Sequence, residues 1–428
     1  MFTTDRMRRA AVAALPLLGL AGPAFAEDTL SAGDTAWILT SSALVLMMTI
    51  PGLALFYGGL VRSKNILSVL MQCLLSAGWV TVVWVLVGYS IAFGGEGMFW
   101  GGLSKMGMSG VGPDTLSGTI PEYAFSMFQL MFAIITPALM VGAFAERMKF
   151  SAWFAFLTLW LIFVYCPLAH MVWGDGGLIA GWGALDFAGG LVVHMSSGFS
   201  ALVAALYLGK RKGFGSEAMP PHSLPFTVIG AALLWVGWFG FNAGSSLAAD
   251  GTAGLAFFTT QTATGMAVVG WVVIEWLHRG KPTVLGGATA AVAGLVAITP
   301  ACAFVSPMGA IGVGLGAAVF CYAAVTLLKP AMGYDDSLDV FGVHGIGGAW
   351  GALAAGLFTW SGATDVVSGQ ILIQLKSIAF TAVFCGGMTI VILVVLKAVM
   401  GDLRVGEEEE SLGLDLAEHS ETAYDRIG

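Results

Sequence analysis

The chain has 428 residues, of which 57% are hydrophobic and only 10% are charged, and its formal net charge is −8. A soluble domain carries roughly a quarter of charged residues, so this composition excludes a soluble enzyme or binding domain. With a mean hydropathy of +0.86, the chain is expected to lie in a lipid bilayer.

The first element is a short apolar stretch near the N-terminus. Three arginines precede this stretch, which covers 10–21, and an A-x-A cleavage signal ends at Ala26. The stretch is shorter than the roughly 20 residues that a membrane span needs, and the pattern is typical of a secretory signal peptide. We therefore predict that residues 1–26 are removed and that the mature chain starts outside the cytoplasm.

Longer apolar stretches, each able to cross a bilayer, then recur along the chain. They lie at 35–57, 66–92, 122–144, 151–171, 187–208, 226–246, 254–277, 283–303, 308–328, 338–358 and 371–399. Their odd number places the two ends of the mature chain on opposite sides of the membrane. The N-terminus is expected in the periplasm and the C-terminus in the cytoplasm.

The basic residues give an independent check of this orientation, because lysine and arginine crowd the cytoplasmic loops of membrane proteins. The loops assigned to the inside carry Arg62, Lys64, Arg147, Lys149, Lys210, Arg211, Lys212, Arg279, Lys281, Lys329 and Arg404. Only Lys105 falls in an outer loop. Together with the signal peptide, this pattern favours a multi-pass protein of the inner membrane of a Gram-negative cell.

The remaining features predict no catalytic, metal or cofactor site. The five cysteines lie in or beside apolar stretches without a C-x-x-C pair, as small buried side chains do. No nucleophile with an adjacent base is apparent outside the apolar stretches. The segment 401–428 is acidic, with a run of glutamates at 407–410. Such a tail either stays solvated or docks a partner at the cytoplasmic face.

Two histidines, His194 and His344, lie inside otherwise uncharged apolar stretches. An ionisable group within a membrane span is costly and marks a functional site by default. Each follows an aspartate and glycines: Asp186 precedes His194 by eight residues, and Asp339 precedes His344 by five. We expect the two histidines to share one site.

The positions of the histidines also suggest an internal repeat. Each lies in the fifth span of one half of the chain, which predicts two inverted repeats over about 35–208 and 226–358, with an eleventh helix over 371–399. Inverted repeats place a substrate path at the interface between the two halves. The predicted fold is therefore an all-α polytopic membrane protein with eleven helices.

Several ordered blocks resemble the ammonium transporter (Amt/Mep/Rh) family, on its bacterial Amt side. These blocks cover 128–132, 142–147, 169–174, 186–198, 237–245 and 339–345. The similarity extends from the first span to the acidic tail. The resemblance implies a membrane domain over 27–400 with the 5+5+1 arrangement, a homotrimer with one path per subunit, and a cytoplasmic tail over 401–428.

The resemblance also implies three layers of functional residues. An outer site that recruits ammonium by cation–π contact and hydrogen bonding is matched by Phe128, Phe132, Trp173 and Ser245. A pair of stacked rings that closes the path is matched by Phe132 and Phe241. The pore lining and proton relay below it are matched by His194, His344 and Trp238. Without the family, Trp173 would be read as an interfacial aromatic and the phenylalanines as core or lipid-facing residues.

Two aspartates are assigned a structural or electrostatic role. Asp186 is expected to cap the helix that carries His194 and, to a smaller extent, to stabilise a cation in the outer site. Asp339 is expected to act in the same way near the cytoplasmic end of the tenth span.

The function implied is transport of ammonium, with methylammonium as a further substrate. Ammonium is held outside, loses a proton, and passes the rings and histidines as ammonia, with separate and electrogenic proton transfer. The alternatives are a neutral gas channel for ammonia or carbon dioxide, and a sensor that signals through its tail. A PII-type (GlnK-like) protein is the regulatory partner that the resemblance implies at the cytoplasmic face.

Overall fold

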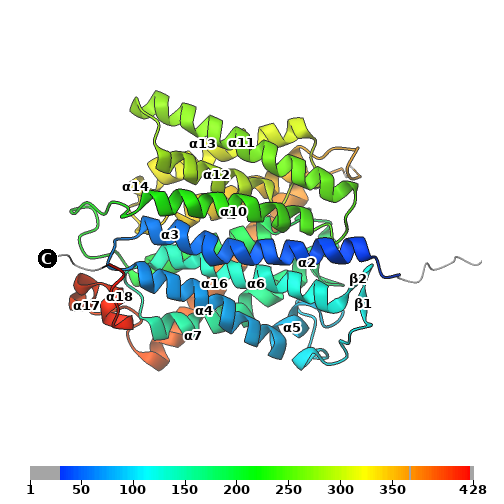
Figure 1. Ribbon diagram of the computed structural model, residues 1–428, viewed down its shortest axis with the longest axis horizontal. Coiled ribbons are helices and arrows are strands. Elements are labelled where there is room, and N and C mark those ends of the chain that lie inside the picture. The colour runs from blue at the N-terminus through cyan, green and yellow to red at the C-terminus, as the bar shows by residue number, and fades with distance from the viewer. Residues whose placement is uncertain (1–28, 366–367, 425–428) are drawn as a thin grey trace, which may run out of the picture.

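The computed structural model of this chain describes residues 29–365 and 368–424, so the predicted signal peptide lies outside the described residues. The described chain forms one bundle of long helices whose axes run in a common direction (Figure 1). The tail helices lie at one end of this bundle, and a short β-hairpin lies at the other (Figure 1). The arrangement places the two predicted membrane faces at opposite ends of the helices.

The helices of the first half follow the predicted spans closely. They are α2 (Ala32–Met47), η1 (Met48–Leu53), α3 (Ala54–Leu60), α4 (Ile66–Val83), η2 (Trp84–Gly88), α5 (Tyr89–Phe93), α6 (Glu122–Phe144), α7 (Phe150–Trp160), η4 (Leu161–Tyr165), α8 (Cys166–Trp173), η6 (Gly190–Met195) and α9 (Ser196–Leu208). Short elements in the outer loops are η3 (Met106–Met108), β1 (Leu116–Ser117), β2 (Ile120–Pro121) and η5 (Ala180–Trp182).

The rest of the described chain is helical as well. Its elements are α10 (Leu224–Gly244), α11 (Gly251–Arg279), α12 (Val284–Ile298), α13 (Pro307–Ala323), η7 (Ala324–Leu328), α14 (Lys329–Met332), η8 (Phe341–Gly345), α15 (Ile346–Leu357), α16 (Gln370–Met400), α17 (Glu407–Leu412) and α18 (Leu414–His419). Nine helices in the described chain are long and apolar enough to cross a membrane, and α12 is a shorter apolar helix. The fold class is thus confirmed as helical and polytopic, while the total of eleven spans stays a prediction.

Side chains at the helix starts explain why the helices begin where they do. The first amides of a helix have no partner within the helix and need an acceptor. Ser31 supplies one for α2 by accepting from Asp34 N, Asp250 does so for α11, and Thr283 does so for α12. These three helices therefore start at polar caps, and apolar residues follow.

The two segments that carry the histidines share a backbone feature that also occurs in η1, η2, η4 and η7. His194 lies in the π-helical turn η6, which continues as the α-helix α9. His344 lies in a second π-helical turn, η8, which continues as α15. Such turns often mark functional sites. The two segments cross where Gly198 meets Gly345, and a Cβ on Gly198 would collide with Gly345 N. Glycine at this crossing lets the two histidine segments approach closely.

Lys105, the one basic residue in a predicted outer loop, has a structural explanation. Its ammonium group pairs with the carboxylate of Glu122 at the start of α6 and lies 5.6 Å from the centroid of the Tyr89 ring. The Tyr89 hydroxyl donates to the same carboxylate at 2.6 Å. The charge of Lys105 is therefore neutralised by Glu122. A basic residue in this loop is thus compatible with the predicted orientation.

Candidate functional site

An outer cavity of about 200 Å³ opens at the end of the bundle that carries the β-hairpin. Its lining residues are Phe93, Phe125, Gln129, Phe132, Trp173, Phe187, Ser245 and Leu247. Three of the four residues assigned to the outer site, Phe132, Trp173 and Ser245, come together here from three different helices. Phe128 does not line the cavity: it is buried behind Phe132, with ring centroids 5.0 Å apart.

Gln129 and Phe125 line the same cavity but were not predicted as site residues. Residues 125, 128, 129 and 132 are three or four positions apart and therefore share one stripe of α6. Helical spacing from Phe132 could thus have identified Gln129 as a candidate, but it does not distinguish the residues that line the cavity from the buried Phe128. The side-chain amide of Gln129 adds a hydrogen-bonding group to a wall that is otherwise mainly aromatic.

The tryptophan and the serine of the outer cavity are held by hydrogen bonds to the backbone. Trp173 Nε1 donates to the carbonyl of Asp186 at 2.9 Å, and the Ser245 hydroxyl donates to the carbonyl of Phe241 at 2.9 Å. The Ser245 oxygen therefore keeps its lone pairs for a donor such as an ammonium ion. The Trp173 ring meets the Phe132 ring edge-on, with centroids 5.9 Å apart.

Two phenylalanine rings close the floor of the outer cavity. The centroids of Phe132 and Phe241 are 4.2 Å apart, with an angle of 32° between the rings. The two side chains come from α6 and α10, and both residues are almost fully buried. A path through this point has to move these rings aside, and their faces offer no hydrogen bond to a hydrated ion.

Directly below the rings, the two histidines contact each other. His194 Nδ1 lies 3.2 Å from His344 Nδ1, so one ring donates its proton and the other accepts it. In neutral imidazole, the other nitrogen has the opposite role. The free Nε2 atoms therefore present one acceptor and one donor along the path. Among the described residues, His194 Nε2 has no hydrogen-bond partner.

Trp238 supports the histidine pair from one side. Its ring stacks on His194 with centroids 5.4 Å apart, and its Nε1 donates to the Thr299 hydroxyl at 2.8 Å. His194 also stacks on Phe241 at 6.1 Å. The structure thus brings the predicted gate and relay residues into one continuous aromatic column.

Cavities above and below the column complete the path. A gap of about 10 Å³, lined by Phe241 and both histidines, separates the outer cavity from an inner cavity of about 210 Å³. The gap has room for about one water-sized molecule. Phe56 and His344 line both the gap and the inner cavity. Apart from the histidines, the residues that line the gap are all apolar.

The carboxylate of Asp186 caps the start of η6, the segment that carries His194. Its two oxygens accept from the amides of Gly189, Gly190, Leu191 and Val192 at 2.5–3.3 Å. Four backbone donors thus fix the turn that positions His194. This is the capping geometry for which an aspartate at a helix N-terminus is suited.

The second aspartate differs from the expectation. The carboxylate of Asp339 accepts from Lys329 Nζ at 2.6 Å. The cap on η8 comes from Asp336, whose Oδ2 accepts from Phe341 N at 2.7 Å. The predicted capping role of Asp339 is therefore corrected to Asp336. Asp336 precedes His344 by eight residues, the same spacing as between Asp186 and His194, and this equality was the signal in the sequence.

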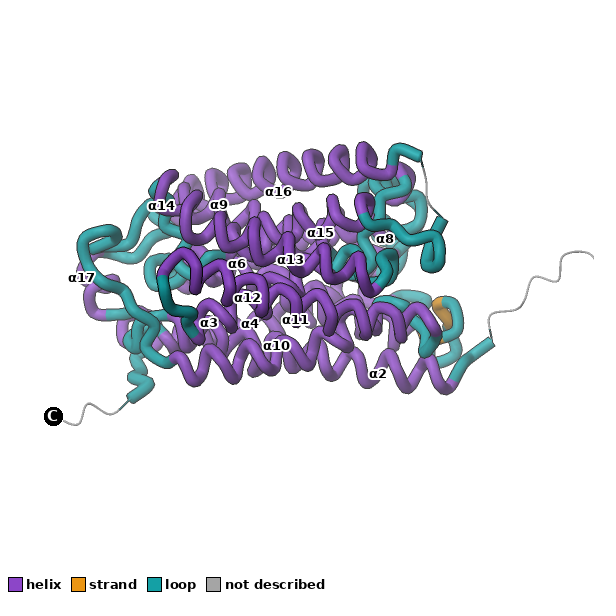
Figure 2. Tube along the Cα trace, turned by 90° about the horizontal axis from the view of Figure 1, so that it is seen from above, coloured by secondary structure: helices purple, strands orange, loops and turns teal. Residues whose placement is uncertain are grey.

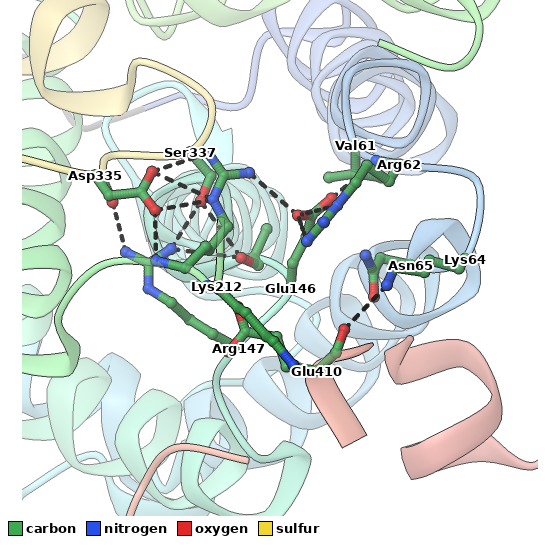
Figure 3. Close-up of polar contacts among 12 residues, drawn as sticks. Val61, Arg62, Lys64, Asn65, Glu146, Arg147, Lys212, Asp335, Ser337 and Glu410 are labelled. Carbon is green, nitrogen blue, oxygen red and sulfur yellow. Dashed lines mark hydrogen bonds and ion pairs between the residues drawn. The ribbon is translucent and has the colours of Figure 1, made fainter. Parts of the chain in front are cut away.

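Charged residues gather at the predicted cytoplasmic end, in what we call the cytoplasmic cluster: Arg62, Glu146, Arg211 and Asp335. Figure 3 shows Arg62, Glu146 and Asp335 of this cluster. Glu146 pairs with Arg62 at 2.7 Å and with Arg211 at 3.2 Å, and Arg211 pairs with Asp335 at 2.8 Å. These residues come from four separate loops. Burial alone would raise the pKa of Glu146, but the charges of Arg211 and Arg62 outweigh it and hold this pKa below its usual value.

The acidic tail packs against this cytoplasmic end. Glu410 accepts from Lys212 N at 2.6 Å and pairs with Arg404 at 2.6 Å. Asp415 Oδ1 accepts from Ser68 N near the start of α4 at 2.8 Å, and Glu418 accepts from Phe150 N, the first residue of α7, at 3.0 Å. Two tail carboxylates therefore lie at the N-termini of two membrane helices, where negative charge is favourable.

The described residues contain no group of three or more histidine, cysteine or acidic side chains arranged to hold a metal ion. The site contains three environments in series: the outer cavity, which can attract a cation, the apolar rings of Phe132 and Phe241, and two imidazoles that can form hydrogen bonds. Such a sequence of environments can bind a small cation outside and pass a small neutral molecule.

Comparisons with known proteins point to one family. The model of the Ammonium Transporter Family matches residues 36–424. The ammonium transporter of Bacillus subtilis is 50% identical over 402 residues, which are 92% of this chain and 98% of the relative. The ammonium transporter of Aquifex aeolicus is 49% identical over 410 residues, which are 93% of this chain and 95% of the relative.

Solved structures are similar as well. The crystal structure of Candida albicans Mep2 superimposes with a TM-score of 0.84 at 34% identity, covering 92% of this chain and 91% of that chain. A structure described as a sensor Amt protein also gives a TM-score of 0.84, at 29% identity, covering 90% of this chain and 98% of that chain.

Proposed function

This chain belongs to the ammonium transporter family, and on that premise we propose that it recruits ammonium from the periplasm and delivers its nitrogen to the cytoplasm as ammonia. The outer cavity is the entry point. The rings of Trp173 and Phe132 attract a small cation by roughly 0.5–2 kcal/mol, and the Ser245 hydroxyl accepts one of its hydrogen bonds. The carboxamide of Gln129 is a further acceptor within the same wall.

The next step is transfer of a proton from ammonium to water in the outer cavity, which leaves neutral ammonia at the floor of the cavity. An unpaired ion in a low-dielectric interior costs many kilocalories per mole, and a protonated group releases its proton instead of paying this cost. The gap below Phe132 and Phe241 offers a cation no carboxylate. Neutral ammonia has no such desolvation penalty and is small enough for the gap.

The histidine pair then forms hydrogen bonds with the neutral molecule. Ammonia can donate to the acceptor nitrogen of one imidazole and accept from the donor nitrogen of the other. The contact between the Nδ1 atoms also links the two rings, so that a proton can move separately along the pair. This separate proton transfer makes the transport electrogenic. A neutral gas channel would use the same rings without net charge movement.

A single observation carries the proposal: the unbroken column Phe132–Phe241–His194–His344, which separates two cavities that open toward opposite ends of the bundle. This column supports passage of a small uncharged molecule. It is unsuited to a hydrated cation, since the only polar groups in the gap are the imidazoles.

The test is the current evoked by an ammonium pulse in proteoliposomes of the purified protein. We expect a current in the wild type and its loss in the His194→Ala/His344→Ala double variant. An ammonium-dependent pH change without current would support the neutral channel. Neither signal from well-folded protein would contradict transport altogether.

A second candidate function, sensing of ammonium, is favoured by two observations. One solved structure with a similar fold is described as a sensor Amt protein. The tail of this chain also contacts the starts of α4 and α7 and the loop at Lys212, which would let it report changes in the bundle. Tail-dependent signalling in cells expressing a conduction-deficient variant would separate sensing from transport.

The location, the oligomeric state and the regulatory partner of the protein are inferred from the same family membership. We infer an inner-membrane homotrimer with the N-terminus in the periplasm and the tail in the cytoplasm. Large apolar side chains on α11 and α13 are exposed in the single subunit, among them Phe258, Val269 and Leu315, which is consistent with further subunits or lipid covering them. A PII-type protein at the cytoplasmic face is the expected regulator, and co-purification with and without the tail tests it.

A further inference from the structure

Lys376 occupies an unusual place for a lysine. It lies on α16, a long helix at one edge of the bundle (Figure 2), and its side chain is exposed. The neighbouring side chains on this surface are apolar and open to the surroundings: Leu372 is 71% exposed and Val383 is 76% exposed. Exposed apolar residues on a membrane helix face lipid or another subunit, and we assign this surface of α16, at the edge of the bundle, to lipid.

The depth of Lys376 in the membrane follows from the second lysine of the same helix. Lys376 and Lys397 are separated by about 32 Å along α16 at a rise of 1.5 Å per residue, close to the roughly 30 Å thickness of the hydrocarbon core. Each ammonium group lies over an aromatic ring, that of Trp182 or that of Tyr207. Aromatic residues and lysines of this kind mark the two lipid–water interfaces. Lys376 is therefore at headgroup level on the outer side.

The lysine is held in a fixed position. Its Nζ lies 3.6 Å from the centroid of the Trp182 ring. The Trp182 ring in turn meets Phe380 edge-on at 5.6 Å, and Phe380 stacks on Phe384 at 5.8 Å. By contrast, Lys397 Nζ lies 5.9 Å from the Tyr207 ring. A lysine that only reached for water would not need a packed aromatic support beneath it.

The charge of Lys376 has no protein partner in the described parts of the chain. The salt bridges found there involve other cations. Lys105, also on the outer side, is paired with Glu122, and most other basic residues lie at the cytoplasmic end. Trp182 Nε1–H also has no acceptor among the side-chain hydrogen bonds of the described residues. Lys376 Nζ and the N–H of the indole ring beneath it are thus two neighbouring donors.

We propose that Lys376 and Trp182 form a binding site for the phosphate headgroup of an anionic phospholipid in the outer leaflet. The ammonium group supplies the charge, the indole N–H supplies a second hydrogen bond, and the acyl chains cover the apolar surface around Leu372 and Val383. A zwitterionic headgroup fits less well, because its own ammonium group competes with Lys376 for the phosphate. This site is separate from the pore and does not depend on the proposed transport.

The test is a titration of the purified protein in detergent with phosphatidylglycerol, phosphatidylcholine or inorganic phosphate, followed by native mass spectrometry of bound molecules. For the wild type, we expect phosphatidylglycerol to bind at least fivefold more tightly than phosphatidylcholine, and inorganic phosphate not to be retained. In Lys376→Gln, the affinity for phosphatidylglycerol should fall about fivefold, which corresponds to about 1 kcal/mol for one basic residue at an anionic surface. Lys376→Arg should retain the affinity.

Lys397→Gln is the matched control, since it removes a lysine from the other end of the same helix. We expect a change of less than twofold there. An equal loss in Lys376→Gln and Lys397→Gln would overturn the proposal in favour of a general attraction to basic helix ends. Equal binding of phosphatidylglycerol and phosphatidylcholine by the wild type would overturn it without any variant.

Discussion

The proposed pore and the cytoplasmic cluster lie in one bundle but differ in how many charged groups they contain. In the cluster, the buried carboxylates of Glu146 and Asp335 form ion pairs with the largely covered Arg211, with several hydrogen bonds. In the gap between Phe241 and His344, the lining has no acidic or permanently charged group. A buried charge is tolerated when a partner meets it and is costly when none does. The comparison therefore explains why a cation is expected to stop above the pore.

The largest effect is expected from breaking the cluster. Glu146→Gln leaves Arg62 and Arg211 without their shared carboxylate and should destabilise the protein by about 3 kcal/mol, the scale for removing one partner of a buried pair. Thermal unfolding in detergent measures this loss. Glu408→Gln is the matched control, because Glu408 is an exposed glutamate of the tail, and it should change stability by less than about 0.5 kcal/mol.

Acid should reproduce part of this loss in the wild type. The pKa of Glu146 is lowered in the folded protein, so its stabilising contribution is complete above the unfolded value of about 4.5 and is lost as pH falls through the lower folded value. The unfolding midpoint should therefore decline below about pH 4.5, and less so in Glu146→Gln. Parallel pH profiles for the two proteins would contradict the role of this pair.

The next largest effect is expected in the outer cavity above the proposed pore. Trp173→Leu removes the cation–π surface of the outer cavity, which is worth roughly 0.5–2 kcal/mol. The ammonium concentration for half-maximal current should rise by roughly twofold to thirtyfold, while the unfolding midpoint changes little compared with Glu146→Gln. Trp276→Leu, at an exposed tryptophan of α11, should leave the half-maximal concentration unchanged. An unchanged value in Trp173→Leu would show that this ring does not bind the substrate.

A smaller effect concerns the contact between the tail and the bundle. Asp415→Ala removes the carboxylate that caps α4 and should weaken tail docking by about 1 kcal/mol. Limited proteolysis of the tail should then proceed about fivefold faster than in the wild type. Glu421→Ala, a change at an exposed acidic residue nearby, is the control for lost charge. If both variants are cleaved at the wild-type rate, Asp415 does not hold the tail.

The smallest effect is a stabilisation. Ser420 ends α18 in the left-handed region, with φ of 57°, where a residue with a Cβ is strained and glycine is not. Ser420→Gly should strengthen tail docking by about 0.5 kcal/mol and slow the proteolysis. Ala417→Gly, within the right-handed part of α18, should have the opposite effect. A faster cleavage in Ser420→Gly would contradict the strain assigned to this residue.

Much of the fold could be predicted because membrane spans depend on local sequence. The stretch predicted at 122–144 coincides with α6, since about twenty apolar residues suffice to define a span. The helix predicted at 283–303 is shorter, because α12 ends at Ile298 and the chain turns at Pro300. A proline without an amide hydrogen cannot continue the helical bonding.

The site could be predicted only where residues act through local motifs or the family resemblance. The contact between His194 and His344 joins residues 150 positions apart, and the equal positions of the histidines in the two halves pointed to it. Glu146 meets Arg62 and Arg211 through contacts between loops, which leave no periodic pattern in the sequence. Asp336 was missed because three aspartates lie within five residues, and only the backbone geometry distinguishes the cap from its neighbours.

The most direct test of the central claim compares ammonium and potassium pulses on the same wild-type proteoliposomes. Both ions carry one positive charge, but only ammonium can release a proton and cross the gap as a neutral molecule. The uncharged pore predicts a current with ammonium and none with potassium at equal concentration. A potassium current of similar size would mean that the gap admits a cation and would contradict the account.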